Sequence, residues 1–577
     1  MENVKNVLSI DDDVLLLIIS LLSHKDARAV ACMSKYAYCL ATPSTLHDAS
    51  YPYNRRESET SRWEYILGDD KYLGVPRRRY LRALGVWTYP KDETEMASLL
   101  EALPSFSNLR SLHCGHSSRL IEQHPRFVEG IPNLVRLTEI ELQEFFSTTL
   151  PSLSAVLAAP HLTNVTLSLP EDPEDNEYWD VSQGFALLTT LAALPSLSTL
   201  SLICPAIGIP PRSTTMRTIP MLSSLRHMFI KLLVSEASAN IVAYCPNLIT
   251  LELGCWETQG VYEMKEDHLA HLSLLTKDIW PSIHELDCSM PWSTSFTDCL
   301  GRARKVTIHD RHLDHHEDYL PILSKTLPSC LHLMYLKWGN LEWWPSMDQF
   351  ETEHDLVKYA WKEVANTLPQ LRSLVLGLYD TALNGDFMSM LLDALLPLPL
   401  TYLSLQFNAP YTPLMSKHTA MAHANEMRAA EVLRVDTLRA LPDALLRALP
   451  HVRVFSLLGC KAILNFTDLR SGRSEPFWED VKPDFDTAIQ AQDAVDEEWG
   501  ETSPQVDEHL RELRRRADET AGLRNERWWW VEGEGEERRA IEIWKEKGEW
   551  ARDVIESVDF QPGDLTGMFS DSWRYDP

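Results

Sequence analysis

The sequence lacks the short motifs that mark many enzyme active sites. It contains no Gly-x-Gly-x-x-Gly, no phosphate-binding Gly-x-x-x-x-Gly-Lys, no Gly-x-Ser-x-Gly and no His-Glu-x-x-His. We therefore expect a protein that is not an enzyme, with no catalytic residues and no cofactor.

Long hydrophobic runs are also missing. The longest candidate, Val14 to Leu22, falls well short of the roughly 20 apolar residues that a membrane-spanning helix needs. Three aspartates, Asp11 to Asp13, precede it where a signal peptide would place lysines. A signal peptide or membrane anchor is thus the weaker interpretation of this segment, and we expect no membrane partner.

Positive charge is scarce, with 54 lysines and arginines against 83 aspartates and glutamates and a formal net charge of −29. Nucleic-acid phosphates demand a basic face, so we expect no nucleic-acid partner. One basic run, Pro76 to Arg82, could contact phosphate or act as a nuclear-import patch, but a solvated edge of the first repeat explains it better. So acidic a chain favours basic surfaces on its partners.

The ten cysteines show no spacing typical of a disulfide framework. Cys114 and Cys288 occupy positions that leucines fill in other repeats of the chain, where a small buried thiol can replace an aliphatic side chain. Unpaired thiols in a core suit a reducing compartment, so we expect a cytoplasmic or nuclear location.

The chain does contain a repeated phrase between Tyr80 and Cys460, a proline followed by leucines at Leu-x-x-Leu-x-Leu spacing. The copies run over Leu103 to Cys114, Ile131 to Leu142, Ala159 to Leu169, Leu194 to Ile203, Ile219 to Ile230, Cys245 to Cys255, Trp280 to Ser289, Leu327 to Trp338, Leu368 to Leu378, Leu396 to Phe407 and Leu449 to Cys460, with weaker copies at Tyr80 to Val86 and Arg304 to Asp310. In one copy, Leu251 and Leu253 project from the same side of a short strand. Such leucines are buried only when equivalent strands stack in parallel, so the phrase predicts a solenoid.

Helices are predicted between the strands, because apolar residues recur at three- and four-residue spacing before the next proline. The expected helices are Glu95 to Leu103, Phe185 to Leu194, Ala237 to Tyr244, Asp355 to Leu368, Asp386 to Leu396 and Ala429 to Leu449. The proline then ends each helix, since it cannot donate the next backbone hydrogen bond.

These copies resemble the leucine-rich repeat family. The family consensus adds an Asn or Cys three positions after the last leucine, and Val452, Phe455, Leu457 and Cys460 reproduce that spacing. Successive prolines are roughly 25 to 50 residues apart, wider than the 20 to 29 of regular arrays. The resemblance implies an α/β fold, an irregular horseshoe of parallel strands with outer helices.

The segment from Ile10 to Lys35 resembles an F-box, a small all-α module. The matching residues are Asp13, Val14, Leu15, Ile18, Leu21, Leu22, Asp26, Ala29, Val30, Met33, Ser34 and Lys35. The family usually opens with Leu-Pro, and Ile10 and Asp11 stand there instead. Asp26 is the expected N-cap of a second helix ending near Lys35.

The F-box resemblance implies that this module docks on the Skp-type adaptor of a cullin ubiquitin ligase. The residues that it assigns to the adaptor interface are Ile10, Val14, Leu15, Ile18, Leu21, Leu22, Val30 and Met33.

The last 107 residues, Ser471 to Pro577, break the leucine phrase and carry 29 acids against 14 bases. They hold eight tryptophans, at Trp478, Trp499, Trp528, Trp529, Trp530, Trp544, Trp550 and Trp573. Charged helices are expected at Val506 to Arg527 and Glu536 to Val558, with pairs such as Glu512 and Arg516. Either these helices cover the open end of the array, or they form a partner-binding arm with aromatic anchors.

Two further groups could be functional. Histidines His309, His312, His315 and His316 could bind zinc, but a polar loop is the simpler interpretation and we expect no metal. Trp292, Trp343 and Trp344 lie after repeat strands and are candidate target-binding residues.

The expected organisation is an F-box-like helical module (1–45), linker helices (46–79), a leucine-rich-repeat array (80–465) and an acidic, tryptophan-rich helical tail (466–577). The pairing of module and array predicts a substrate-recognition subunit of a cullin-based ubiquitin ligase with an unidentified protein target. The alternative is a repeat-based interaction scaffold whose N-terminal helices only cap the array.

Overall fold

A computed structural model describes residues 11–22, 24–51, 65–70, 72, 74–87, 93–169, 179–203, 207–209, 220–231, 238, 240–254, 283–289, 303–309, 316–337, 359, 362–379, 385–407, 436–459 and 526–575. The chain divides into two compact units, Met1–Ile283 and His284–Pro577.

The N-terminal unit begins with three short helices, α1 (Asp12–Ser20), α2 (His24–Ala31) and α3 (Lys35–Thr45). Asp11 caps α1 by accepting a hydrogen bond from the Asp13 N–H at 3.0 Å, and Ser34 caps α3 by accepting one from Ala37 N–H at 3.0 Å. The prediction for the second helix was wrong in its bounds. Asp26 lies in the first turn of α2. Lys35 begins a third helix because the side chain of Ser34 caps the N-terminus of that helix.

The strands of this unit form a parallel sheet in chain order. They are β1 (Asp48–Tyr51), β2 (Ala83–Val86), β3 (Ser111–Cys114), β4 (Glu139–Leu142), β5 (Asn164–Ser168), β6 (Thr199–Ile203), β7 (His227–Lys231) and β8 (Thr250–Leu253). The register aligns Leu84, Leu112, Ile140, Val165, Leu200, Met228 and Leu251 in one row, and each is at most 1% exposed. The parallel stack of leucines that the repeated phrase predicts is confirmed.

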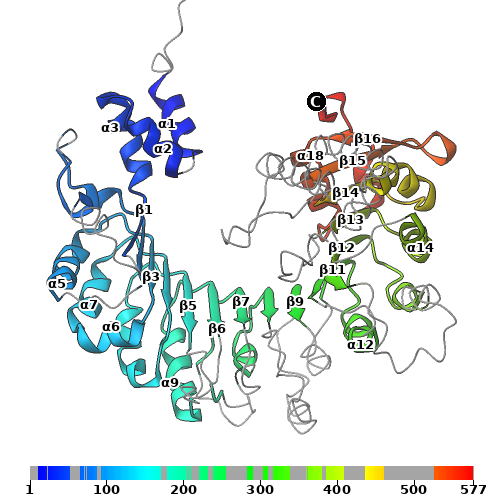
Figure 1. Cartoon of the computed structure of the whole chain (residues 1–577). Helices are drawn as coiled ribbons and strands as arrows, with labels where there is room; N and C mark the ends of the chain where they lie inside the picture. Colours follow the sequence, from blue (N-terminus) through cyan, green and yellow to red (C-terminus); the bar gives the residue numbers. More distant parts are fainter. Residues whose placement is uncertain are drawn as a thin grey trace, which may run out of the picture. The chain divides into compact units, whose positions relative to one another are not determined.

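Helices and 3-10 turns line one side of this sheet (Figure 1). They are η2 (Arg77–Tyr80), α5 (Glu93–Ala102), η3 (Leu103–Ser105), α6 (Ser117–Gln123), α7 (Pro125–Gly130), η4 (Ile131–Asn133), η5 (Ser147–Ser152), α8 (Leu153–Val156), α9 (Val181–Ala192) and η6 (Asn240–Tyr244). Pro104 and Pro132 of the repeated phrase lie within η3 and η4, just before the turn into the next strand. Of the helix predicted at Ala237 to Tyr244, Asn240–Tyr244 form a 3-10 helix.

The sheet begins one strand earlier than the sequence predicted. β1 lies in the segment 46–79, for which linker helices were expected, and it pairs in parallel with β2. The Arg82 and Ala83 N–H groups both donate to His47 O, at 2.8 and 3.0 Å, which ties this segment to the first repeat. The sequence of β1, DASY, contains no leucine, so the repeat pattern could not reveal it.

The C-terminal unit contains β9 (Glu285–Ser289), β10 (Lys305–His309), β11 (Cys330–Lys337), β12 (Ser373–Tyr379), β13 (Tyr402–Phe407) and β14 (Val454–Leu458), again parallel and in chain order. α12 (His316–Thr326) and α14 (Gly385–Leu395) connect them, and residues 362–367 and 436–448 are also helical. The helices predicted at Asp355 to Leu368, Asp386 to Leu396 and Ala429 to Leu449 are confirmed over these described residues.

The tryptophan-rich segment extends this second sheet. β15 (Glu526–Glu532) pairs antiparallel with β14, and β16 (Arg539–Ile543) pairs antiparallel with β15. α18 (Lys545–Ile555) and the turns η12 (Gly535–Glu537), η13 (Pro562–Leu565) and η14 (Asp571–Trp573) complete the segment. The helices predicted at Val506 to Arg527 and Glu536 to Val558 were therefore wrong at residues 526–527 and 539–543, which lie in strands, whereas α18 confirms the second over Lys545–Ile555. In β15 consecutive tryptophans alternate between the two faces of the strand. The Glu512 and Arg516 pair lies outside the described residues.

The tryptophan-rich segment was predicted either to cover the open end of the array or to form a partner-binding arm. Residues 526–575 agree with the first interpretation. Trp528, Trp529 and Trp530 are 2%, 4% and 5% exposed, and β15 covers the edge of the last repeat strand. Cys114 and Cys288 are buried as predicted, each 1% exposed. In the described part of the chain, no helix is long and apolar enough to span a bilayer.

Candidate functional site

The N-terminal helices bury one apolar face and expose another. Leu15 and Ile19 of α1 are 4% and 1% exposed and pack against Ala41 of α3. Apolar residues follow one another without a break from Val14 to Ile19, so a core this small cannot cover every side of the helix.

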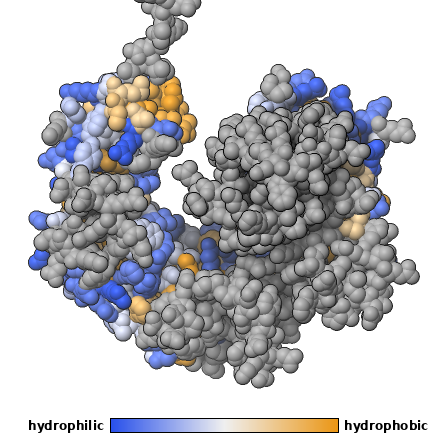
Figure 2. All heavy atoms as spheres, in the orientation of Figure 1, coloured by the Kyte–Doolittle hydropathy of each residue, from blue (hydrophilic) through white to orange (hydrophobic). Residues whose placement is uncertain are grey.

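The uncovered side of α1 carries Val14, Leu17, Ile18 and Leu21, whose three- and four-residue spacing places them on one face. Their exposed fractions are 48%, 61%, 41% and 79%, and Met33, which follows α2, is 68% exposed. Figure 2 shows hydrophobic surface gathered over these N-terminal helices. Val14, Leu17, Ile18, Leu21 and Met33 are called the N-terminal apolar face below.

Four of the eight residues assigned to an adaptor interface lie in this face: Val14, Ile18, Leu21 and Met33. The prediction that Leu15 belongs to the adaptor interface was wrong, because Leu15 is buried in the core of the module. Leu22 and Val30 are half-buried against the same core, and Ile10 lies outside the described residues. The sequence analysis missed Leu17, although its spacing from Val14 and Leu21 could have revealed it.

The opposite side of the module is attached to the first repeats through α3. The Tyr38 hydroxyl lies 2.6 Å from the Tyr65 hydroxyl and donates to Asp70 Oδ2 at 3.2 Å. Lys35 lies over the ring of Tyr72, 4.9 Å from its centroid. Among the described residues, these contacts use α3 and not the N-terminal apolar face, which remains exposed.

The arginine run after Pro76 supports this attachment. Arg77 is 8% exposed, lies over the Tyr65 ring at 3.8 Å and forms an ion pair with Asp70. Arg78 Nη1 donates to Leu67 O at 3.0 Å. Burial and the hydrogen bond with Tyr38 raise the pKa of Tyr65 to about 12, so its phenol remains neutral. Two of the four arginines are thus structural, and only Arg79 and Arg82 are exposed.

Other predicted candidates contribute less. His309 Nε2 lies 2.7 Å from Asp287 Oδ1, and the described residues contain no group of three or more metal-binding side chains. His312 and His315 lie outside the described residues, as do Trp292, Trp343 and Trp344.

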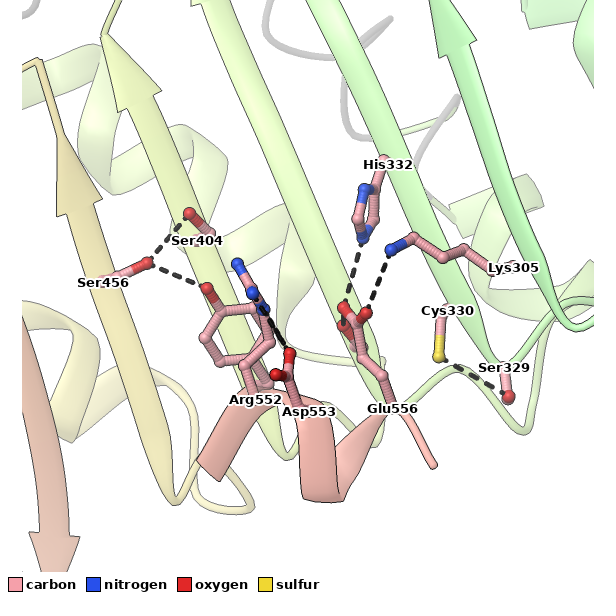
Figure 3. A network of polar contacts seen from close by, with 11 residues as sticks. Lys305, Ser329, Cys330, His332, Ser404, Ser456, Arg552, Asp553 and Glu556 are labelled. Carbon is pink, nitrogen blue, oxygen red and sulfur yellow. Dashed lines mark hydrogen bonds and ion pairs between the residues drawn. The ribbon is translucent and has the colours of Figure 1, made fainter. Parts of the chain in front are cut away.

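A second polar group lies beneath α18 in the C-terminal unit (Figure 3). Glu556, just after α18, accepts a hydrogen bond from Ser373 Oγ at 2.8 Å, and its carboxylate lies 3.2 Å from Lys305 Nζ and 3.2 Å from His332 Nε2. Burial alone would raise the pKa of Glu556, but contacts with His332, Lys305 and Ser373 outweigh it and lower the pKa to about 2. One carboxylate therefore ties α18 to β10, β11 and β12.

Apolar packing covers the sheet beside this carboxylate. The cluster contains Val375, Tyr402, Val454, Trp528, Trp530, Ile543, Ala551, Ile555, Phe560, Leu565 and Trp573. The Glu556 group is thus part of a structural contact between helix and sheet. No sequence pattern could reveal it, because Glu556 is 183 to 251 residues away from Ser373, His332 and Lys305.

No family model matches the sequence, and no curated protein matches it. Among solved structures, the chain is similar to the crystal structure of the leucine-rich repeat-containing protein LegL7 from Legionella pneumophila, with 14% sequence identity and a TM-score of 0.29. The match covers 65% of this chain and 90% of that chain. At so low a TM-score the assignment of an α/β, leucine-rich-repeat-like parallel sheet rests on the strand pairing and buried leucine rows of this chain itself.

Proposed function

We propose that this chain is a recognition subunit of a cullin-based ubiquitin ligase, in which the N-terminal helices bind a Skp-type adaptor and the repeats bind a target protein. The observation that carries the proposal is the N-terminal apolar face, because grouped exposed apolar side chains are typical of binding surfaces. The role is geometric: holding a lysine-bearing target near the ubiquitin carrier raises its effective concentration and needs no catalytic residue in this chain.

The departure from the F-box pattern at Asp11 is compatible with this proposal. Asp11 has φ −53°, which lies in the range that proline adopts, and its side chain caps α1. A helix therefore begins at Asp12 in this chain without the Leu-Pro pair with which the family usually opens.

The alternative is a scaffold in which these helices only cap the array. A cap turns its apolar residues towards the repeats that it covers. Here α3 contacts the segment before β2 through a hydrogen bond from Tyr38 to Asp70, the edge-on contact of the Tyr38 and Tyr72 rings, and Lys35 over Tyr72, while Leu17 and Leu21 face solvent. This arrangement favours a docking surface.

The test is binding of the full chain to a purified Skp-type adaptor, measured by titration calorimetry. Leu17→Lys with Leu21→Lys should weaken binding by at least about a hundredfold, because central apolar anchors carry most of the energy of such interfaces. Lysine is a good helix former and is favourable near the C-terminal end of α1, so the module should remain folded.

The matched control is Val135→Lys, a similar change at a residue that is 53% exposed in the repeat array. It should bind the adaptor as the unchanged chain does. Absence of adaptor binding by the unchanged chain, or equal binding by the Leu17→Lys, Leu21→Lys variant, would leave the scaffold as the better interpretation.

A further inference from the structure

The sheet face opposite the leucine rows of the N-terminal unit is acidic over β1–β4. The register places Asp48, Ala83, Ser111 and Glu139 in one row, and Gly85, His113 and Glu141 in the next row on the same face. β1–β5 contain no lysine or arginine. Asp48, Glu139, Glu141, His113 and the adjoining Trp87 are called the acidic sheet face below.

Trp87 is held on this face by two glycines. A Cβ on Gly85 would come within 2.4 Å of Trp87 Nε1, and one on Gly115 would come within 2.7 Å of Trp87 O. The indole also stacks on the His113 ring, with centroids 6.2 Å apart and planes 19° apart. The local sequence thus places a partly exposed aromatic ring beside the carboxylates.

Hydrogen bonds fix the carboxylate at the centre of the face. Glu141 Oε2 lies 2.7 Å from His113 Nδ1, and Glu141 Oε1 accepts from Gln143 Nε2 at 2.7 Å. The bond with His113 lowers the pKa of Glu141, and burial opposes this only partly, so the group is ionised at neutral pH. The hydrogen bond with Glu141 raises the pKa of His113, burial opposes this, and the charges of Glu139 and Asp48 raise the pKa further. The strand register places Asp48 and Glu139 in one row of this face and Glu141 in the neighbouring row.

Ser111 Oγ lies 2.7 Å from His113 Nε2, so serine, histidine and carboxylate are connected in the order found in serine hydrolases. Acyl transfer also needs free N–H donors for the oxyanion. The backbone N–H groups around this serine are used in the sheet, as where Ser111 N–H donates to Arg82 O and Gly115 N–H donates to Val86 O. The group is therefore better suited to binding than to catalysis.

The end of β4 adds another carboxylate. Glu144 follows Gln143 with φ 50°, a conformation that costs energy for a residue other than glycine. Its side chain contacts His116 Nδ1. The strained turn therefore holds a fourth acidic side chain just after β4.

In the C-terminal unit, a segment of the chain itself covers the equivalent face of the sheet. There α18 lies on the side opposite the leucine rows, the sheet supplies Lys305 and His332, and the covering segment supplies the carboxylate of Glu556. In the N-terminal unit the sheet supplies carboxylates instead. By charge complementarity, the segment that fits this face carries cations.

We propose that the acidic sheet face binds a lysine- or arginine-bearing segment of a protein target, with its cations beside Asp48, Glu139 and Glu141 and their apolar stems against Trp87. Ala83 and Ser111 are small and lie between Asp48 and Glu139 in one row, so a long side chain can reach the sheet there. This inference deepens the proposed function, on which it rests for the idea that the array holds a target.

The test is fluorescence anisotropy with the purified full chain and a labelled synthetic peptide that alternates arginine and serine. Glu139→Gln with Glu141→Gln should weaken binding about tenfold or more, and Trp87→Ala about threefold. A peptide with glutamine in place of arginine should not bind. The matched control, Glu101→Gln with Glu129→Gln, removes the same charge from exposed positions of α5 and α7 and should leave the affinity within about twofold.

Equal weakening by both pairs, or by neither, would show that the peptide responds only to the overall acidity and would overturn the inference. The assay contains no adaptor, and the Leu17→Lys, Leu21→Lys chain should bind the peptide normally. A failure of the adaptor experiment therefore leaves this result unchanged, and loss of peptide binding in the Glu139→Gln, Glu141→Gln variant with intact adaptor binding supports this inference alone.

Discussion

Phe455 and Trp529 are directly paired across β14 and β15, with ring centroids 4.9 Å apart and planes 15° apart. Phe455 belongs to the last copy of the repeated phrase, and Trp529 lies in the tryptophan-rich segment, so the stack joins the two. An exposed hydrophobic strand edge invites aggregation. In this chain an antiparallel strand covers that edge.

Trp529→Ala should lower the free energy of unfolding of the C-terminal unit by about 3 to 5 kcal/mol, because it leaves a void beside Phe455 in a buried layer. Urea unfolding followed by circular dichroism would measure the change. Trp544→Ala serves as the control, since Trp544 is 41% exposed, and should cost much less. Equal losses in both variants would mean that Trp529 has no special part in closing the sheet.

Removal of the residues after 460 should expose Phe455, Leu457 and the edge of β14 together. We expect the shortened chain to aggregate or to melt at a lower temperature, because no strand would then cover the last repeat. Light scattering during thermal unfolding would detect both. A shortened chain that stays monomeric with an unchanged melting temperature would contradict the structural role given to β15.

The Leu374→Ala variant tests the parallel stacking of leucines from one repeat strand to the next. Leu374 is fully buried between Leu331 and Leu403 in adjacent strands, so the substitution should cost about 2 to 5 kcal/mol. Hydrogen exchange should show lost protection in β11 and β13 as well as β12, since each strand is supported by its neighbours. A loss confined to β12 would be the contradictory result.

The stability of the C-terminal unit should depend on Glu556 at acid pH. Its pKa is lowered from the ordinary value of 4.5 to about 2 in the folded chain, so its contribution to stability is complete above pH 4.5. The contribution, up to about 3 kcal/mol, should disappear as pH falls from about 4.5 towards 2. Comparison of urea midpoints at several pH values would show it.

Glu556→Gln should remove this part of the pH dependence and lower the stability most at neutral pH. Glu549→Gln changes a partly exposed carboxylate of α18 that lies 3.9 Å from Lys545 Nζ, and it should keep the pH profile of the unchanged chain. If the stability of the Glu556→Gln variant depends on pH in the same way as that of the unchanged chain, the contacts with Lys305, His332 and Ser373 do not stabilise the folded unit.

The repeat strands could be predicted because burial imposes a pattern on them. Leu251 and Leu374 belong to phrases that recur, and each recurrence implies a neighbour in a parallel stack. β1 and β15 could not be found in this way. β1 contains no leucine. β15 lies largely between the two predicted helices, Val506 to Arg527 and Glu536 to Val558, and its three consecutive tryptophans do not carry the leucine phrase that marks the repeat strands.

The candidate sites required the structure for two different reasons. In α1 the residues from Val14 to Ile19 are all apolar, so the sequence does not show that Leu15 is buried while Leu17 is exposed. On the acidic sheet face, Asp48 and Glu141 are 93 positions apart in numbering and meet only through the register of β1–β4. Neither relationship follows from local spacing alone.

Leu15 and Leu17 give the last prediction, because the same substitution at two nearby positions of α1 should have opposite consequences. Leu15→Ala should destabilise the helical module by about 2 kcal/mol or more, since it leaves a void against Ile19 and Ala41, and hydrogen exchange in residues 11–46 should rise. Leu17→Ala should change stability by less than about 0.5 kcal/mol, because the side chain is 61% exposed.

Adaptor binding should separate the two variants further. Leu17→Ala should weaken it by about tenfold without altering exchange, as expected of an interface anchor. Leu15→Ala should weaken it only to the extent that the module unfolds, so lower temperature should restore binding. A Leu17→Ala chain that binds the adaptor normally, while Leu15→Ala fails at every temperature, would indicate that the interface uses a different side of α1 from the N-terminal apolar face.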